Sequence, residues 1–440
     1  TEEVFYDLCD EYGLLVWNDF WMSTEGYNIH PNDNQLFMDN ARDVVRRFRN
    51  HASIALWCPR NEGYAPPALE DSLARLIATE DGTRHYQPQS RYLNLRTSGP
   101  WNYQWQPAKY FTDIAGGFST ELGTPAVPTA ASMRKMMDAK DVWPIGDVWY
   151  YHDLHSGQTA YLRAIDSLYG TATSLEDFCS KAQLINYDSH RAMFESWNSK
   201  LFNNTTGLLL WMTHPAWPST VWQVYSWDYE TFGAYYGSLK SCEPVHIQMN
   251  LTDNKVVAVN TSLQNFSDIR GALTLYDSSG KILFQQAATS NLASNHQVVF
   301  FTPVLPQTLP DVYLARVMLT DAKDSLLSLN DYWKHSENTS DFYTLKGNKS
   351  PKIAIDKWKD DNGRIRFTIT NTATVTAVSI KLNLAEKGTN KIVLPAYFSD
   401  GYFNLLPGES RVMTVDYNKK LYATVSLLAE AYNLPSQVIY

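Results

Sequence analysis

The stretch Ser53–Pro67, SIALWCPRNEGYAPP, decides the fold prediction. Its first part, Ile54–Trp57, is an apolar run of the kind that forms a buried strand, and Pro59 breaks it. Asn61 and Glu62 follow directly after this break. Parallel α/β folds place their chemistry just past the carboxyl ends of buried strands, so Glu62 is a candidate catalytic carboxylate.

A second stretch, Ile114–Pro128, IAGGFSTELGTPAVP, has the same design. Here Glu121 is predicted to follow a short strand, and Gly117 and Gly123 flank it. A single glutamate in a loop is usually a solvated surface charge. Two carboxylates at the ends of two different strands are instead what acid-assisted cleavage of a glycosidic bond requires.

Composition narrows the class of protein. The 440 residues suffice for two or three domains, and the formal charge of −9 argues against a nucleic-acid partner. The 14 Trp and 27 Tyr favour carbohydrate binding through ring stacking; the alternative is that they fill the cores of β-rich domains. The four cysteines form no CxxC pair and the histidines show no paired ligand spacing, so we expect no metal and no cofactor. No apolar run is long enough to span a membrane.

The first 241 residues alternate between helical and strand patterns, which predicts parallel βαβ units. In the first predicted helix, Val4, Leu8 and Tyr12 recur on one face, and Gly13 ends it. About six strand–helix repeats are present, whereas a closed barrel needs eight. We therefore expect a (β/α)8 barrel whose first strands lie upstream of Thr1. The predicted helices are Glu2–Tyr12, Asn32–Asn50, Ala68–Ala78, Thr129–Met137, Leu175–Trp197 and Thr231–Lys240, and the predicted strands include Leu14–Trp17, Arg84–Gln87, Tyr92–Leu95 and Gly207–Trp211.

After Cys242 the pattern changes to short alternating segments separated by Asn, Asp, Gly and Ser, which is typical of antiparallel sandwiches. A polar stretch, Lys334–Asn348, divides them into two sets. We expect two immunoglobulin-like domains after the barrel. The predicted domains are 1–241 for the catalytic barrel, 242–345 for the first sandwich and 346–440 for the second.

Two polar residues near the predicted barrel mouth are candidates for substrate binding. Asn61 is suited to hydrogen-bond the 2-hydroxyl of a sugar, a contact that strengthens in the transition state. Asp19 is predicted to end a strand on the same side and to bind a sugar hydroxyl, with a helix cap as the alternative role. Glu25 and Asp147 are loop acids with no assignable role.

Aromatic residues supply the remaining candidates. Trp211, His214 and Trp217 follow the last predicted strand and are candidates for a sugar platform, with core packing as the alternative for Trp211. Tyr103 lies in an aromatic loop ahead of the Glu121 strand and is a candidate donor to the nucleophile carboxylate.

The chain resembles glycoside hydrolase family 2 at these positions. Trp57…Asn61-Glu62 resembles the acid/base motif of that family, and Phe118–Gly123 resembles its nucleophile motif. The two glutamates stand 59 positions apart, in the family's order. The resemblance implies a retaining double displacement through a covalent glycosyl-enzyme, with Glu121 as nucleophile and Glu62 as acid and then base.

The stretches Gly99–Tyr110 and Gly207–Trp217, and Cys242–His246 (CEPVH), are similar to the subgroup that holds β-mannosidases, exo-β-D-glucosaminidases and plant endo-β-mannosidase. Exo-glucosaminidases use Asp as the acid where this chain has Glu62, which favours a β-mannosidase-like activity with exo-β-D-glucosaminidase as the alternative. Partners implied are an oligosaccharide or glycoconjugate substrate, and N-terminal domains packed on the barrel. We expect a periplasmic or secreted location. The hypothesis from another class is a catalytically inert carbohydrate-binding fragment, since an incomplete barrel leaves an open sheet edge.

Overall fold

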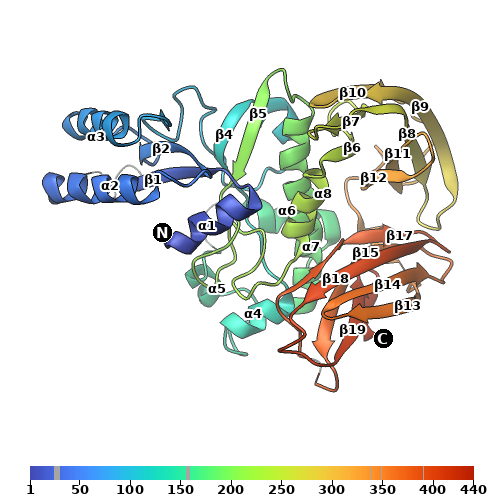
Figure 1. Ribbon diagram of the computed structural model, residues 1–440. Coiled ribbons are helices and arrows are strands. Elements are labelled where there is room, and N and C mark those ends of the chain that lie inside the picture. The colour runs from blue at the N-terminus through green and yellow to red at the C-terminus, as the bar shows by residue number, and fades with distance from the viewer. Residues whose placement is uncertain (24–29, 155–158, 338, 348, 390) are drawn as a thin grey trace. The chain divides into compact units, whose positions relative to one another are not determined.

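The computed structural model describes residues 1–23, 30–154, 159–337, 339–347, 349–389 and 391–440 (Figure 1). The chain forms two compact units. The N-terminal unit comprises residues 1–99, 117–121 and 207–209, and the C-terminal unit comprises residues 100–116, 122–206 and 210–440.

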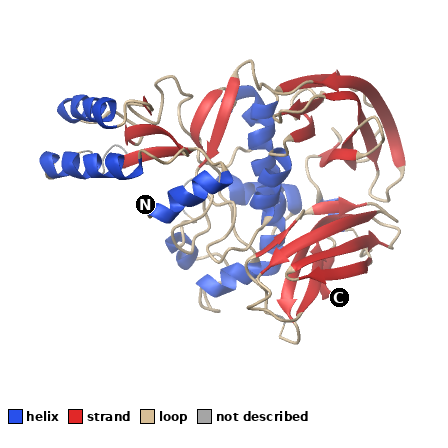
Figure 2. Ribbon diagram, viewed as in Figure 1, coloured by secondary structure: helices blue, strands red, loops and turns tan. Residues whose placement is uncertain are grey.

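The N-terminal unit is built as parallel strands with connecting helices (Figure 2). Strands β1 (Val16–Met22), β2 (Ile54–Arg60) and β3 (His85–Tyr86) pair in parallel in chain order. Helices α1 (Glu3–Tyr12), α2 (Asn34–Phe48) and α3 (Pro67–Glu80) precede or connect them, and α2 and α3 lie side by side (Figure 1). Parallel neighbours with helical crossovers are the expected barrel units.

Helix α2 shows why the pattern predicts this arrangement. The side chain of Asp33 caps its first turn by accepting a hydrogen bond from the Leu36 amide, 3.0 Å away. Phe37, Ala41 and Val45 are four residues apart, Phe48 follows three residues later, and all are buried. Arginines of the opposite face reach Glu80 at the end of α3, so the polar side also joins the two helices.

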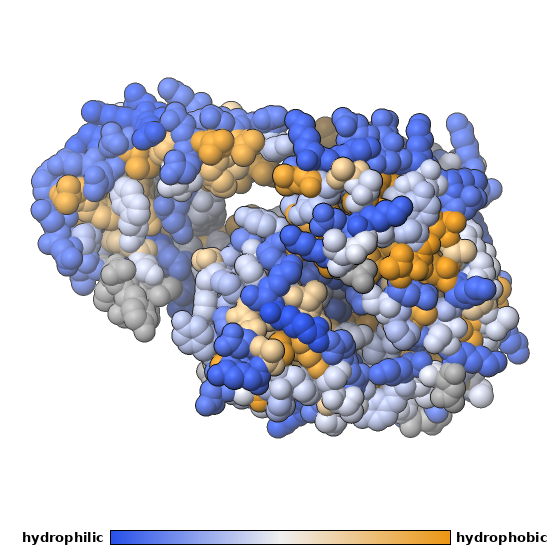
Figure 3. All heavy atoms as spheres, turned by 90° about the horizontal axis from the view of Figure 1, so that it is seen from below, coloured by the Kyte–Doolittle hydropathy of each residue, from blue (hydrophilic) through white to orange (hydrophobic). Residues whose placement is uncertain are grey.

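Helix α1 is present as predicted, and Gly13 caps it with φ of 69°. Its Val4, Leu8 and Tyr12 face is exposed, with Tyr12 71% accessible. The buried side chains are instead Tyr6 and Cys9. Figure 3 also shows apolar patches on the face of this unit that it displays. The N-terminal unit therefore carries apolar surface that none of the described residues covers.

Strands β4 (Gly117–Leu122) and β5 (Thr205–Leu210) form a two-stranded sheet. Arg96 forms an isolated parallel bridge with Ser119 of β4. The predicted strand Tyr92–Leu95 is wrong, because this segment forms turns. The side-chain oxygen of Gln89 accepts hydrogen bonds from the amides of Arg91 and Tyr92, which replaces strand pairing with a local turn.

The C-terminal unit contains helices α4 (Ala130–Met136), α5 (Asp147–Tyr151), α6 (Thr159–Tyr169), α7 (Leu175–Asn198) and α8 (Gly233–Ser241), with a π-helical turn at Tyr110–Ile114 and a 3₁₀ turn at Tyr343–Lys346. Helix α7 is buried on most of its surface, and α8 packs against it closely. A Cβ at Gly233 would stand 2.4 Å from the Gln183 carbonyl oxygen, and one at Gly237 would stand 2.3 Å from that of Tyr187. Two glycines one helical turn apart therefore set this helix spacing.

The strands described after α8 all pair in antiparallel sheets. The first sandwich pairs β10-β7-β6 in one sheet and β12-β11-β8-β9 in the other, and the second pairs β13-β14-β18-β16 and β17-β15-β19-β20. This confirms the predicted fold class of a barrel portion followed by two immunoglobulin-like sandwiches. The strands of the first are β6 (Val245–Met249), β7 (Val256–Asn260), β8 (Phe266–Tyr276), β9 (Ile282–Leu292), β10 (His296–Phe301), β11 (Val312–Thr320) and β12 (Leu326–His335), and those of the second are β13 (Ile353–Asp361), β14 (Arg364–Asn371), β15 (Ala377–Glu386), β16 (Ala396–Phe398), β17 (Phe403–Leu405), β18 (Ser410–Tyr417), β19 (Val425–Ala431) and β20 (Leu434–Val438).

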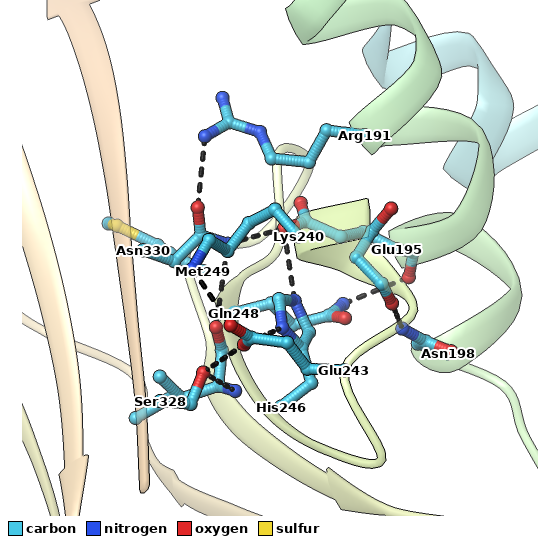
Figure 4. A network of polar contacts seen from close by, with 12 residues as sticks. Arg191, Glu195, Asn198, Lys240, Glu243, His246, Gln248, Met249, Ser328 and Asn330 are labelled. Carbon is cyan, nitrogen blue, oxygen red and sulfur yellow. Dashed lines mark hydrogen bonds and ion pairs between the residues drawn. The ribbon is translucent and has the colours of Figure 1, made fainter. Parts of the chain in front are cut away.

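A buried polar network joins α7 to the first sandwich (Figure 4). Glu195 of α7 is fully buried, and its Oε1 atom accepts hydrogen bonds from Asn330 Nδ2 at 2.6 Å and from the Tyr332 hydroxyl at 2.7 Å. His246 of β6 lies between two carboxylates, 3.3 Å from Glu195 and 3.2 Å from Glu243. Glu243 and His246 belong to the CEPVH stretch, so this stretch anchors the sandwich to the helix.

Candidate active site

Asn61 and Glu62 begin the loop directly after β2, as predicted. The amide of Asn61 donates to the Met22 carbonyl oxygen at the end of β1, 3.1 Å away. Glu62 has a φ of 50°, in the left-handed region that a non-glycine residue adopts at a cost of about 1–3 kcal/mol. The surrounding contacts therefore hold the Glu62 backbone in a conformation that a non-glycine residue seldom adopts.

Two serines that follow β3 hold this loop. The Ser90 hydroxyl accepts from the Glu62 amide at 2.9 Å and donates to the Asn61 Oδ1 atom at 2.7 Å. The Ser98 hydroxyl donates to the Glu62 Oε1 atom at 2.7 Å. Ser90 thus fixes the backbone of the loop, and Ser98 fixes the direction of the carboxylate.

The same two serine segments reach β4. The Thr120 hydroxyl donates to the Ser90 carbonyl oxygen, and the Gly99 amide donates to the Glu121 carbonyl oxygen at 2.7 Å. Ser98 and Gly99 are adjacent, so the Glu62 carboxylate lies within roughly 10 Å of the Glu121 backbone. Glu121 is half-buried and lies inside β4 as its penultimate residue. The prediction that it follows a strand is therefore wrong by two residues.

Asp19 differs more from its predicted position. It lies in the middle of β1, opposite Cys58 of β2, so the prediction that it ends a strand is wrong. The Trp17 indole, two residues away on the same face, donates to the Asp19 Oδ1 atom at 2.8 Å. Asp19 is exposed, yet partial desolvation by the protein around it raises the pKa of its carboxyl, and the hydrogen bonds from Trp17 and Cys58 oppose this rise. Trp17 also stacks on Phe118 of β4 at 6.3 Å between ring centroids.

The aromatic candidates belong to the C-terminal unit. Tyr103 is buried in a core cluster, in edge contact with Tyr161, and burial raises the pKa of its hydroxyl. Trp211 and Trp217 are each 38% exposed, so neither side chain is buried in the core.

Two of the candidate rings, Trp217 and His214, stack on neighbouring aromatic side chains. Trp217 stacks on His152 at 5.6 Å. His214 lies between the rings of Tyr225 and Tyr229, at 5.0 and 4.9 Å between ring centroids. The loop thus carries two partly exposed indoles, Trp211 and Trp217, and an aromatic stack around His214.

Sequence reasoning missed Ser90 and Ser98, because their hydrogen bonds join positions about thirty residues apart. Asp147 begins α5, where a carboxylate interacts favourably with the helix dipole. Glu25 lies outside the described residues. In the described ranges, no group of three or more His, Cys, Asp or Glu residues is arranged to hold a metal ion. None of the helices there combines the length and apolar character needed to cross a membrane.

Residues 1–190 match the model of the glycosyl hydrolases family 2 TIM barrel domain. Over this stretch the chain is similar to the barrel domain of glycoside hydrolase family 2. Residues 330–434 match the exo-β-D-glucosaminidase Ig-fold domain, so the family 2 barrel and an Ig-fold domain occur in one chain.

The curated relatives include β-mannoside- and β-glucosaminide-cleaving enzymes. The chain is 31% identical over 404 residues to a mannosylglycoprotein endo-β-mannosidase of Lilium longiflorum, which covers 78% of this chain and 42% of that protein. It is 27% identical over 472 residues to an exo-β-D-glucosaminidase of Streptomyces avermitilis, which covers 94% of this chain and 52% of that protein. The chain spans about half the length of the curated relatives it matches.

Solved structures show the same fold. An exo-chitosanase of Amycolatopsis orientalis superposes with a TM-score of 0.89 at 22% identity, covering 100% of this chain and 59% of that one. A β-D-mannosidase of Dictyoglomus thermophilum superposes with a TM-score of 0.78 at 21% identity, covering 99% of this chain and 55% of that one. The family 2 architecture is therefore shared along the whole of this chain.

Proposed function

We propose that this chain belongs to a retaining glycoside hydrolase that cleaves β-linked sugars, with Glu62 as acid/base and Glu121 as nucleophile. One observation carries the proposal: adjacent residues of one segment, Ser98 and Gly99, hydrogen-bond the Glu62 carboxylate and the Glu121 backbone. Retaining enzymes need their two carboxyl groups about 5–5.5 Å apart, on opposite sides of the bond to be cleaved. The shared segment, which contacts the Glu62 carboxylate and the Glu121 backbone, supports the proposal that the two residues act as a pair.

The reaction has two steps. The protonated Glu62 gives its proton to the leaving oxygen while the Glu121 carboxylate attacks the anomeric carbon, which breaks the glycosidic bond and forms a glycosyl ester. Glu62 then takes a proton from water, and the resulting nucleophile attacks the same carbon and releases Glu121. The sugar leaves with its original configuration. Asn61 is proposed to bind the 2-hydroxyl, and Trp211, His214 and Trp217 are proposed to bind sugar rings.

For the substrate we propose β-mannosides, which accords with the 31% identity to an endo-β-mannosidase. The second candidate is β-glucosaminides, because the Ig-fold match and several relatives carry the exo-β-D-glucosaminidase description. The location outside the cytoplasm and the domain limits at 241/242 and 345/346 also stand as proposals. Where further domains of the family accompany this chain, we expect them to cover the exposed face of α1.

The test compares aryl β-mannosides and β-glucosaminides as substrates for wild type, Glu121→Gln and Glu62→Gln. Each sugar is tested with a good leaving group, 2,4-dinitrophenol, and with a poor one. We expect Glu121→Gln to abolish turnover with both leaving groups. Glu62→Gln should abolish release of poor leaving groups but still allow a burst of 2,4-dinitrophenol, which departs without a proton. Glu11→Gln, an exposed glutamate of α1, is the matched control and should behave as wild type.

Two results would separate the candidate functions. Turnover of only one sugar class identifies the substrate. Saturable sugar binding with no turnover in wild type, measured on the chain joined to any native upstream domains, would favour an inert carbohydrate-binding protein and overturn the assignment of the two glutamates.

A further inference from the structure

A cavity lies in the C-terminal unit, and neither Glu62 nor Glu121 lines it. It has a volume of about 640 Å³, within the range of small-molecule sites. Residues of α7, of the Tyr343–Lys346 turn and of strands β15 and β19 line it. Seven serine or threonine residues contribute to the lining, so the wall is rich in hydroxyl groups.

The lysines of this cavity are already paired. Lys381 forms a buried ion pair with Glu230, and that carboxylate also accepts a hydrogen bond from the Thr129 hydroxyl. Lys346 binds the Oδ1 atom of Asp177 at 2.9 Å. The cavity therefore offers no free cation for an anionic ligand.

One carboxylate is left over. Glu430 lines the cavity directly across the strand pair from Lys381, and it forms no hydrogen bond or ion pair with the described residues. Burial raises the pKa of this carboxyl; Lys381 opposes the rise and Glu230 adds to it. Glu430 is half-buried, so its unpaired carboxylate has lost part of its hydration, and a bound cation or hydrogen-bond donor would compensate for that loss.

The neighbouring tyrosine is also unsatisfied. Tyr402 lines the cavity and is 7% exposed, and its hydroxyl has no hydrogen-bond partner among the described residues. After burial, the Glu430 and Glu230 carboxylates are the main causes that raise the pKa of this hydroxyl. The hydroxyl is therefore an unpaired polar group buried in the wall of the cavity.

We propose that this cavity is a non-catalytic binding site for a protonated amino sugar. The ammonium group would pair with Glu430, the Tyr402 hydroxyl would hydrogen-bond a ring substituent, and the serine and threonine hydroxyls would bind the sugar hydroxyls. Nothing in this site contributes to the proposed glycosidase step, so sugar binding here and turnover at Glu62 and Glu121 fail independently.

The experiment measures binding of glucosamine by calorimetry to wild type, Glu430→Gln and Ser436→Trp. Glu430→Gln keeps the shape of the side chain and removes its charge, so glucosamine affinity should fall roughly tenfold or more. Ser436 lies at the exposed rim of the cavity, and Ser436→Trp should block binding without altering the buried charges. Glu11→Gln is again the control, and N-acetylglucosamine, which lacks the ammonium, should bind far more weakly.

The outcomes decide the proposal. Loss of a glucosamine site in both variants, with aryl-glycoside turnover intact, supports it. Glucosamine binding that is unchanged in both variants, or equal binding of N-acetylglucosamine, overturns it. Should Glu430→Gln fail to fold, as judged by its melting curve, Ser436→Trp alone gives the answer.

Discussion

His246 is the residue whose replacement most sharply tests the junction between α7 and the first sandwich. It is 1% exposed and lies between Glu195 and Glu243. Burial lowers its pKa, but hydrogen bonds and charge from Glu195 and Glu243 outweigh burial, and the pKa of His246 is raised. The same contacts, with Lys240, hold the pKa of Glu243 at about 2 in spite of burial.

The signs define a pH window. Because the pKa of His246 is raised in the folded state, its contribution to the free energy of unfolding is complete below its unfolded-state pKa of about 6.5. This contribution is lost as the pH rises through its folded-state pKa. Because the pKa of Glu243 is lowered in the folded state, its contribution to the free energy of unfolding is complete above about pH 4.5. This contribution is lost as the pH falls towards 2. The network should therefore stabilise the fold most between about pH 4.5 and 6.5.

In His246→Phe, Glu195 remains buried without its cationic neighbour. Removing one member of a buried pair costs about 3–5 kcal/mol, and we expect the lower end because Asn330 and Tyr332 still donate to Glu195. This loss should apply near pH 6 and shrink towards pH 9, where wild type has also lost the proton.

The assay is denaturant unfolding at pH 6 and pH 9, combined with hydrogen exchange of residues 245–249 and 328–332, because a multidomain chain need not unfold in two states. His296→Phe, at an exposed histidine, is the matched control and should change little at either pH. A destabilisation of His246→Phe that is equal at both pH values, or larger at pH 9, would refute the charged-histidine reasoning.

Two further predictions concern the candidate site. Gly123→Ala should greatly lower soluble yield and the melting temperature, because its Cβ would stand 2.3 Å from the backbone oxygen of Trp211; a variant that melts like wild type contradicts this packing. Trp217→Ala should raise KM by roughly tenfold with little change in melting temperature, since the ring is 38% exposed and its proposed role is stacking on sugar. A fall in kcat at unchanged KM, measured by steady-state kinetics, would remove Trp217 from the sugar platform.

Periodicity predicted the long elements well. Leu175–Trp197 and Asn32–Asn50 were predicted as helices, and the structure has α7 at Leu175–Asn198 and α2 at Asn34–Phe48. Both have capped first turns and a strong apolar repeat, which are local signals. Strand limits were less accurate, because a strand end depends on the neighbouring strand: Asp19 proved to be internal to β1, and Glu121 internal to β4.

The candidate site was predicted only in part. Asn61 and Glu62 lie just after β2 as predicted, but the predicted break at Pro59 is wrong, because the strand continues through Pro59 to Arg60. Ser90 and Ser98 were not predicted, because a serine in a turn has no local signature for a hydrogen bond to a residue 28 or 36 positions away. The exposure of the Val4, Leu8 and Tyr12 face was equally invisible, since periodicity shows which face is apolar and not what covers it.

Strand β12 shows why the first sandwich cannot be understood alone. Its alternate residues Ser328, Asn330 and Tyr332 are buried, yet two of them are polar, which breaks the apolar alternation of a sandwich strand. Each meets a carboxylate from outside the strand: Ser328 donates to Glu243, and the other two donate to Glu195 of α7. A face built to receive a buried carboxylate is unsatisfied without it. The sequence of β12 therefore encodes docking onto α7, and this sandwich is joined to that helix by buried polar contacts.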